Sequence, residues 1–130
     1  MNNPMDYKYS KTDEWVKVEG NQATVGITDF AQQQLSDVVF VEINPAVGST
    51  VQKGKVFGTI ESVKAASDIN LPISGKVVAV NGDLENSPEK VNSEPFTTGW
   101  MLKIEMSNPA ELNELMDADS YTRYCSTREH

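Results

Sequence analysis

Short apolar runs that alternate with polar residues, separated by turn residues, most strongly constrain the fold of this 130-residue chain. Two such runs, at 15–18 and 23–27, flank Gly20 and Asn21. Alternation with a period of two buries one side of a strand, and a turn containing glycine joins two strands as a hairpin. We predict further strands at residues 38–43, 56–62, 76–80 and 100–106.

Helices are predicted at two places. Thr28 or Asp29 caps a short helix in the N-terminal half, and Gln32 stands three residues after Asp29, as in a capping box. Near the C-terminal end, Asn108 precedes Pro109 and an acidic third residue, which is typical of a helix start. An apolar stripe continues this helical segment through Leu112, Leu115, Met116, Ala118, Tyr121 and Tyr124 or Cys125. The pattern predicts an all-β sandwich or small barrel with peripheral helices.

Length and charge narrow the class of protein. The length predicts a single domain, residues 1–130. A net charge of −8 argues against nucleic acid and anionic membranes as partners, and it favours basic protein surfaces. One cysteine, Cys125, excludes an internal disulfide and fits a reducing compartment. The sole histidine, His130, is terminal, which argues against a catalytic role.

The first residues show no signal or transit peptide, and no run is long and apolar enough to span a membrane. We therefore expect a soluble protein of the bacterial cytoplasm, although a trimmed organellar protein would have the same sequence features.

One lysine, Lys64, stands in the stretch TIESVKAASDI, between two predicted strands. Three interpretations compete. The lysine is a solvated turn residue, or a Schiff-base or general-base lysine, or the attachment point of a prosthetic group. The second needs a depressed pKa, which a solvated tip in an acidic chain opposes. The third needs a protruding amine on a rigid turn with small neighbours, and Ser62, Ala65, Ala66 and Ser67 are small.

Other catalytic constellations are missing from the sequence. A Ser-His-Asp set is excluded by the terminal histidine, no His/Cys cluster has metal-ligand spacing, and no glycine-rich loop has nucleotide-binding spacing. The chain therefore favours a carrier over an enzyme.

Several segments resemble the H protein of the glycine cleavage system: KYSKTDEWVKVEG, VGITDFAQQQLSDVVFVEI, ESVKAASDINLPISGKVVAVN, VNSEPFTTGWMLKI and PAELNELMDADSY. The resemblance spans about Tyr7 to Tyr124, and it implies a single lipoyl-carrier domain with a core at about 7–124 and flexible ends. The lysine motif, 61–65, separates this family from lipoyl domains with Asp-Lys-Ala and biotin carriers with Met-Lys-Met. The segment from Asn92 to Trp100 is similar to H protein and absent from those two relatives.

This resemblance implies a mainly-β, barrel-sandwich hybrid of the lipoyl/biotinyl type, with a short helix in the N-terminal half and C-terminal helices. It also implies a non-catalytic carrier with lipoate amide-linked to Lys64. Its expected partners are a pyridoxal-phosphate glycine decarboxylase, a tetrahydrofolate-dependent aminomethyltransferase, dihydrolipoamide dehydrogenase, and a lipoate ligase or lipoyl/octanoyl transferase. Glu61 and Gly75 are expected to help the lipoylating enzyme recognise the hairpin.

By the same resemblance, Thr12, Glu14 and Asp68 are expected to line a cleft for the arm, where a protonated amine would find acidic and hydroxyl groups. Three positions depart from the family pattern. Asp13 and Phe30 stand where histidine is frequent, and Ser36 stands where glycine is frequent. These departures affect the cleft rim or a docking surface, and they leave the lysine motif intact.

Alternatives remain from other functional classes. An H-like protein that relays lipoyl groups to other enzymes would carry the same motif. A non-lipoylated interaction module or a Schiff-base enzyme at Lys64 would use the same hairpin differently.

Overall fold

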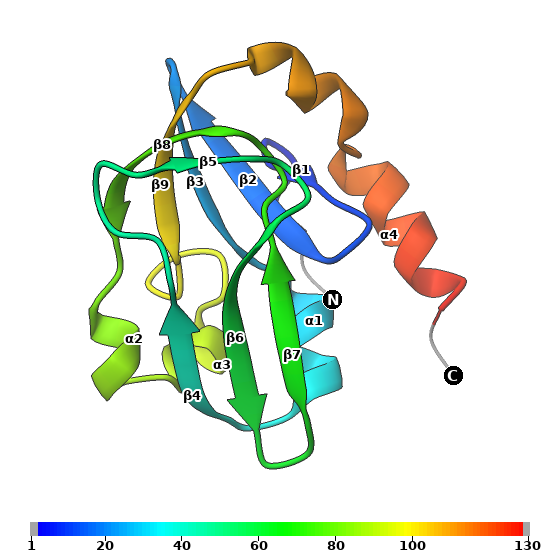
Figure 1. Cartoon of the computed structure of the whole chain (residues 1–130). Helices are drawn as coiled ribbons and strands as arrows, with labels where there is room; N and C mark the ends of the chain where they lie inside the picture. The colour runs from blue at the N-terminus through cyan, green and yellow to red at the C-terminus, as the bar shows by residue number, and fades with distance from the viewer. Residues whose placement is uncertain (1–2, 129–130) are drawn as a thin grey trace.

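Nine strands form two antiparallel sheets in the computed structural model, which describes residues 3–128 (Figure 1). The larger sheet has the order β1-β2-β3-β9-β8-β5, and the smaller has the order β4-β6-β7. The larger sheet contains β1 (Lys8–Tyr9), β2 (Glu14–Glu19), β3 (Gln22–Ile27), β9 (Leu102–Met106), β8 (Gly75–Val80) and β5 (Thr50–Val51). The smaller contains β4 (Val38–Ile43), β6 (Val56–Ser62) and β7 (Ala66–Asn70).

The mainly-β prediction is confirmed, and neither sheet closes on itself in the strand order of residues 3–128. The predicted hairpin of β2 and β3 is confirmed, and its register places Val18 opposite Ala23. Gly20 in its turn has a φ of 63°, a left-handed conformation that glycine adopts without steric cost. The two-residue strands β1 and β5 were not predicted, because two residues are too few to show a period.

The first helix, α1 (Asp29–Leu35), is capped by Thr28, whose Oγ1 accepts a hydrogen bond from the Ala31 amide at 3.2 Å. The predicted capping box is wrong in detail. The side-chain amide of Gln32 donates to the Asp29 carboxylate at 2.7 Å, on the helix surface, and does not reach back to the backbone.

The helical C-terminal segment is divided in two. A 3₁₀ helix, η1 (Pro109–Glu114), ends at Leu115, and α4 (Ala118–Ser126) starts anew with Asp117 as its N-cap. The predicted Asn108 cap makes no side-chain bond. Two further short helices are α2 (Asp83–Asn86) and α3 (Lys90–Ser93). None of the helices within residues 3–128 is long and apolar enough to cross a lipid bilayer.

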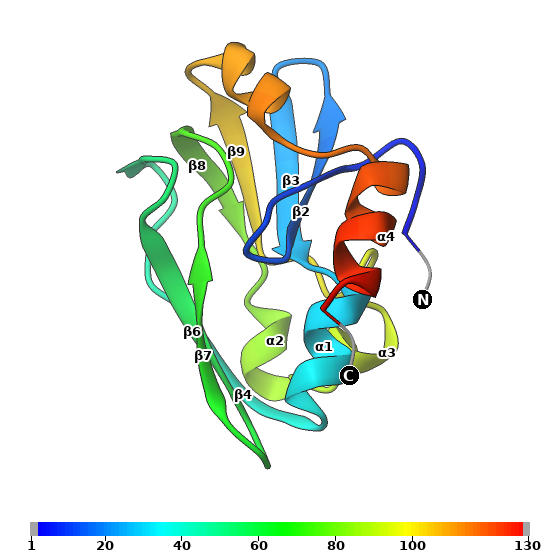
Figure 2. The same cartoon turned by 90° about the vertical axis from the view of Figure 1, so that its right-hand side faces the viewer.

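One apolar core draws side chains from both sheets. A second, aromatic cluster joins α4 to the N-terminal strands (Figure 2). In it the rings of Tyr9 and Tyr121 stack with centroids 4.8 Å apart. Backbone hydrogen bonds between Tyr9 and Met116, of 2.8 and 2.7 Å, attach the C-terminal segment to β1. The helix that follows is therefore fixed against the N-terminal segment. The sole histidine, His130, lies outside the described residues.

Gly75 is the first residue of β8, and its backbone packs closely against β9. A Cβ added there would lie 2.1 Å from the Glu105 carbonyl oxygen and 2.6 Å from Ile104 Cγ2. The structure thus gives Gly75 a packing role, on the sheet that does not contain the lysine hairpin. Its predicted part in recognition by a lipoylating enzyme stays a prediction.

We expect Gly75→Ala to lower the free energy of unfolding by about 3 kcal/mol, because the added methyl group meets backbone that cannot give way. Gly82→Ala is the matched control, since a Cβ there has nothing within 4 Å. Urea denaturation of both variants checks this. Equal stability of Gly75→Ala and wild type would contradict the close packing.

Candidate functional site

Lys64 lies at the tip of the β6–β7 hairpin, which projects beyond the other elements at the lower end of the molecule (Figure 1). The turn is held by its own hydrogen bonds. The Ser62 amide donates to the Ala65 carbonyl at 2.8 Å, and Ser62 Oγ accepts from the amides of Lys64 and Ala65 at 3.1 and 3.0 Å. The Val63 amide donates to the Asp37 carbonyl at 3.0 Å, which ties the tip to the start of β4. The tip backbone is therefore fixed.

The side chain of Lys64 is exposed. Its Nζ lies 3.4 Å from the Gln34 carbonyl oxygen, a long contact that a reacting partner can displace. Within residues 3–128 it forms no ion pair with a carboxylate. The amine is thus accessible on a rigid turn, as the attachment interpretation requires, and it lacks the burial that a Schiff-base lysine needs.

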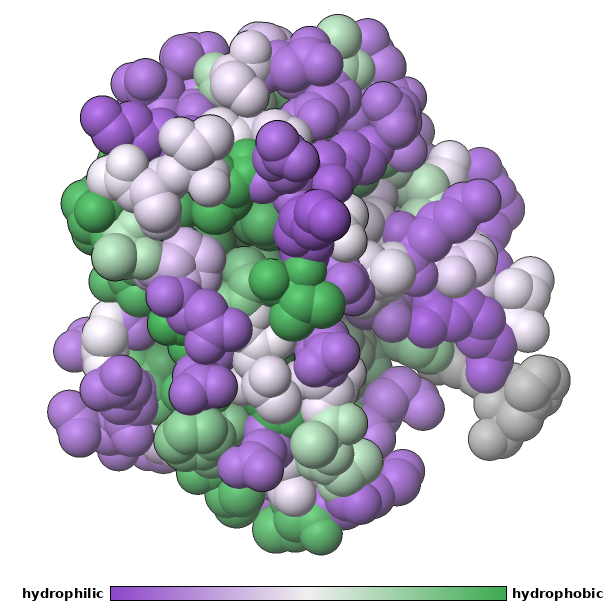
Figure 3. Space-filling model, in the orientation of Figure 1, coloured by the Kyte–Doolittle hydropathy of each residue, from purple (hydrophilic) through white to green (hydrophobic). Residues whose placement is uncertain are grey.

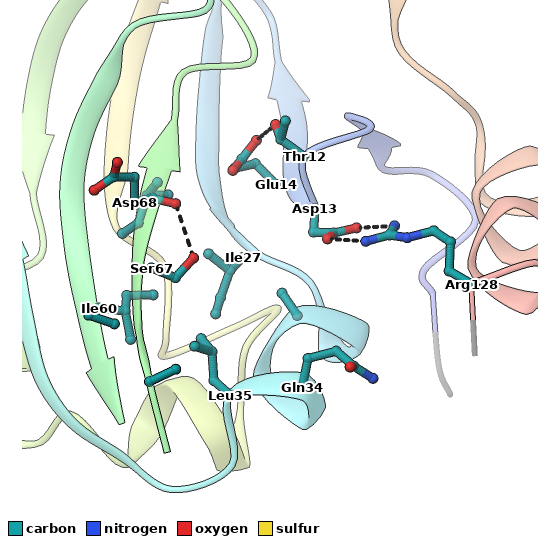
Figure 4. A pocket seen from close by; sticks show the side chains of 14 residues that line it. Thr12, Asp13, Glu14, Ile27, Gln34, Leu35, Ile60, Ser67, Asp68 and Arg128 are labelled. Carbon is teal, nitrogen blue, oxygen red and sulfur yellow. Dashed lines mark hydrogen bonds and ion pairs between the residues drawn. The ribbon is translucent and has the colours of Figure 1, made fainter. Parts of the chain in front are cut away.

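A cleft of about 310 Å³ opens beside the hairpin, between β7, helix α1 and the N-terminal segment (Figure 4). Its near end is formed by Ala65, Ala66 and Gln34, which adjoin Lys64. The whole lining comprises Thr12, Asp13, Glu14, Ile27, Ala31, Gln34, Leu35, Ile60, Ala65, Ala66, Ser67, Asp68, Ile69 and Arg128. The three predicted cleft residues, Thr12, Glu14 and Asp68, therefore all line one cleft, whose near end adjoins the lysine.

Glu14 lies at the polar end of the cleft and is only 1% exposed. Its carboxyl accepts hydrogen bonds from the hydroxyl of Ser10 at 2.7 Å and from that of Thr12. Its second oxygen accepts from the Asn70 amide at 3.2 Å. Burial raises the pKa of Glu14 to about 7, against the opposing effect of these hydrogen bonds. The group is therefore poised to hold or release a proton near neutral pH.

The carboxylate of Asp68 points away from Thr12 and Glu14, to the outer face of β7 (Figure 4). Alternation along the strand explains this, because Ser67 lies opposite buried Ile60 and Asp68 lies opposite Thr59. The hydroxyl on the inner side is that of Ser67. Asp68 thus lines the cleft as predicted, but its carboxylate faces outward. Its predicted role toward the arm stays a prediction.

Glu61, the other residue predicted to take part in recognition, is exposed and lies directly opposite Phe40 and Ala66 on the outer face of the small sheet. No residue within 3–128 forms an ion pair with it. Its carboxylate is therefore free to meet a partner, and its predicted role stays a prediction.

Comparison with known proteins identifies the family. The model of the glycine cleavage H-protein matches residues 7–128. The chain belongs to this family. It is 56% identical over 120 residues to glycine cleavage system H protein 2, mitochondrial, of Arabidopsis thaliana, covering 92% of this chain and 76% of that protein. It is 54% identical over 118 residues to the glycine cleavage system H protein of Brevibacillus brevis, covering 91% and 93%.

A solved structure agrees with the family assignment. The crystal structure of a glycine cleavage system H protein from Mycobacterium marinum matches with a TM-score of 0.83 at 32% identity. The match covers 97% of this chain and 98% of that one. The predicted resemblance to H protein is thus confirmed for both sequence and fold.

Two of the positions that depart from the family pattern meet at one arginine. The guanidinium of Arg128 pairs with both oxygens of Asp13, at 2.8 and 2.7 Å. Its Cζ lies 4.5 Å from the ring centroid of Phe30 and 4.5 Å from that of Tyr124. Tyr121 donates a further hydrogen bond to Asp13 at 2.8 Å. Sequence analysis missed this wall of the cleft, because nothing in the pattern indicates that the end of the chain returns to Asp13.

The third departure, Ser36, ends α1 with φ 65° and ψ −150°. This region is accessible without strain only to glycine, the residue that the family pattern favours. The serine therefore introduces local backbone strain at the end of the helix that carries Gln34.

We expect Ser36→Gly to raise the free energy of unfolding by about 1 kcal/mol, because relief of strain exceeds the entropy that glycine adds to the unfolded chain. Ser36→Ala is the control and should bring no such gain, since alanine is strained in the same conformation. Thermal unfolding measures both. A less stable glycine variant would contradict the strained conformation.

Glu14 predicts a pH dependence of stability. Its carboxyl has a higher pKa in the folded state than the ordinary 4.5, so the folded state binds the proton more tightly. The contribution of Glu14 to stability is fully present below the ordinary pKa, and it is lost as the pH rises through about 7. We expect Glu14→Gln to lack this fall. The unfolding free energy of the variant relative to that of wild type should therefore increase by about 3 kcal/mol between acid and mildly alkaline pH.

Denaturant unfolding as a function of pH tests this expectation. Glu105→Gln, which changes an exposed carboxylate, is the control and should follow wild type. A Glu14→Gln curve parallel to that of wild type would contradict the raised pKa.

Proposed function

We propose that this chain is a lipoyl carrier of the glycine cleavage system, with the lipoyl group amide-linked to Nζ of Lys64. The observation that carries the proposal is an exposed amine, fixed on a hydrogen-bonded turn, at the entrance of a cleft that ends in a buried carboxyl. Membership of the H-protein family supports it.

The residues of the cleft fit such a group. Ile27, Leu35 and Ile60 offer apolar surface to a hydrocarbon arm, and small residues next to Lys64 leave its path open. Glu14 and the hydroxyls of Thr12 and Ser67 lie where the arm would end. The group itself supplies the sulfur chemistry that moves the aminomethyl unit of glycine from a pyridoxal-phosphate decarboxylase to a tetrahydrofolate-dependent aminomethyltransferase, with reoxidation by dihydrolipoamide dehydrogenase.

This chain contributes binding and protection, and no bond-breaking step is assigned to it. The amide at Lys64 removes the positive charge of the amine and leaves a neutral tether. Glu14, in its ionised form, accepts hydrogen bonds from a protonated amine in the cleft, and a charge-assisted bond of this kind is about twice as strong as a neutral one. The walls of the cleft partly shield from water a linkage that water would hydrolyse. The carrier therefore keeps its cargo intact between enzymes, at high effective concentration.

Intact mass of protein produced in lipoate-competent cells tests the proposal. We expect wild type to gain the mass of one lipoyl group and Lys64→Arg to keep its bare chain mass. Lys76→Arg, at an exposed lysine of β8, is the matched control and should gain the group. A wild-type protein without the added mass, or a lipoylated Lys64→Arg, would overturn the proposal.

A second measurement separates glycine cleavage from relay of lipoyl groups. The lipoylated protein is added to the decarboxylase, the aminomethyltransferase and dihydrolipoamide dehydrogenase, and glycine-dependent formation of NADH is followed. We expect turnover with wild type and none with Lys64→Arg. A lipoylated protein that supports no turnover would contradict the role in glycine cleavage and leave relay as the function.

A further inference from the structure

Strand β4 exposes apolar side chains that the core does not use. Its sequence, VVFVEI, is apolar at five of six positions, yet only Val38 and Val41 are buried. A β-bulge lies between Val38 and Phe40, at Val39. The bulge interrupts the alternation, so that Val39 is 55% exposed and Phe40 is 44% exposed. Folding alone does not account for these two side chains.

The exposed residues of β4 continue into the lysine turn. Val63, next to Lys64, is 70% exposed, and its amide is bonded to the Asp37 carbonyl just before β4. Val39, Phe40 and Val63 form what we call the tip patch. Figure 3 shows hydrophobic surface at the lower end of the molecule, over the start of β4 and the tip of the hairpin. A contiguous apolar patch on a soluble protein marks an interaction site more often than a scattered one.

Three carboxylates lie beside the tip patch, on the same face of the small sheet as Phe40. Phe40 lies in register with Glu61. Two residues farther from the hairpin tip, Glu42 lies in register with Thr59, and Thr59 lies in register with Asp68. All three carboxylates belong to exposed residues. The complementary surface is therefore an apolar centre with a basic rim, which also opposes a second copy of this chain, whose net charge is −8.

We infer that the tip patch is the docking surface for the enzyme that acylates Lys64. The inference rests on the proposed function. A lysine reaches only as far as its four-carbon stem, so an enzyme that acts on Nζ must cover the turn and its neighbours. An enzyme that reacts with the far end of the arm does not have to reach Nζ itself. The outward carboxylate of Asp68 has a role here.

The reaction at this surface is acylation of Nζ of Lys64. The deprotonated amine of Lys64 attacks the carbonyl of an activated lipoyl or octanoyl donor, either an acyl adenylate or a thioester. The amide C–N bond forms, the C–O or C–S bond to the leaving group breaks, and the leaving group departs with the electron pair. After the attack the nitrogen carries a positive charge, and it loses one proton to solvent to become the amide N–H.

The test compares two double variants of the unmodified protein, each of which removes two exposed apolar side chains. Val39→Ser/Phe40→Ser alters the tip patch. Val47→Ser/Val56→Ser is the matched control, at residues that are 63% and 48% exposed. Val56 begins β6, at the end opposite the hairpin tip, and Val47 lies between β4 and β5. A lipoate ligase, lipoate and ATP are supplied, and the rate of mass gain is measured against the concentration of the carrier.

We expect the tip-patch variant to raise KM about tenfold or more with kcat nearly unchanged, as for loss of central contacts in an interface. The control should stay within about twofold of wild type. Thermal unfolding confirms that both variants are folded. In wild type, KM should rise with salt, and this dependence should weaken in Glu42→Gln/Asp68→Asn, because the docking is partly electrostatic.

Other outcomes overturn the inference. Equal KM values for the tip-patch variant and the control would exclude the patch from acylation. Normal acylation of the tip-patch variant with loss of glycine-dependent NADH formation would assign the patch to a later enzyme. A concentration-dependent dimer of wild type that the tip-patch variant does not form would assign it to self-association. Absence of acylation in wild type would overturn the proposed function itself, a result distinct from all three.

Discussion

A buried carboxyl, that of Glu14, joins the two sheets of this fold. It starts β2 of the larger sheet, and its side chain accepts a hydrogen bond from the backbone of Asn70, at the end of β7 in the smaller sheet. A buried charge without partners is costly, so the hydroxyls of Ser10 and Thr12 must stay in place to satisfy it. This requirement holds the N-terminal segment against β7, and the gap between them is the cleft. The same group thus shapes the site and supplies its polar end.

The lysine turn and the arm that we propose for it have opposite mechanical properties. Fixing the backbone of one residue in a single conformation costs about 1–2 kcal/mol. The hydrogen bonds of Ser62 and the Asp37 carbonyl meet this cost during folding, so an enzyme that binds the turn does not have to. Flexibility is left to the side chain of Lys64 and whatever it carries. A rigid base with a mobile arm suits recognition by one enzyme and delivery to several.

Much of this architecture could be predicted from the sequence, because period-two alternation and turn glycines are local signals. The β2–β3 hairpin, α1, and the hairpin with Lys64 at its tip follow from them. The direction of the Asp68 side chain depends on the register of β7 with β6, in which Ser67 lies opposite Ile60 and Asp68 opposite Thr59. Register is a property of two strands, so the residues around Asp68 alone do not determine it. The bulge at Val39 and the contact of Arg128 with Asp13 depend on packing between distant segments. Neither leaves a pattern in the residues nearby.

The wall that Arg128 forms has a consequence for the length of the chain. Within residues 3–128, the shared core of the two sheets does not include Arg128, and the guanidinium of Arg128 contacts Asp13, Phe30 and Tyr124 beside the cleft. A protein trimmed before Arg128 would keep its sheets and its attachment point. It would lose one side of the compartment beside them. Carrier molecules with ragged ends would then be alike in fold and unlike in how well they shelter what they carry.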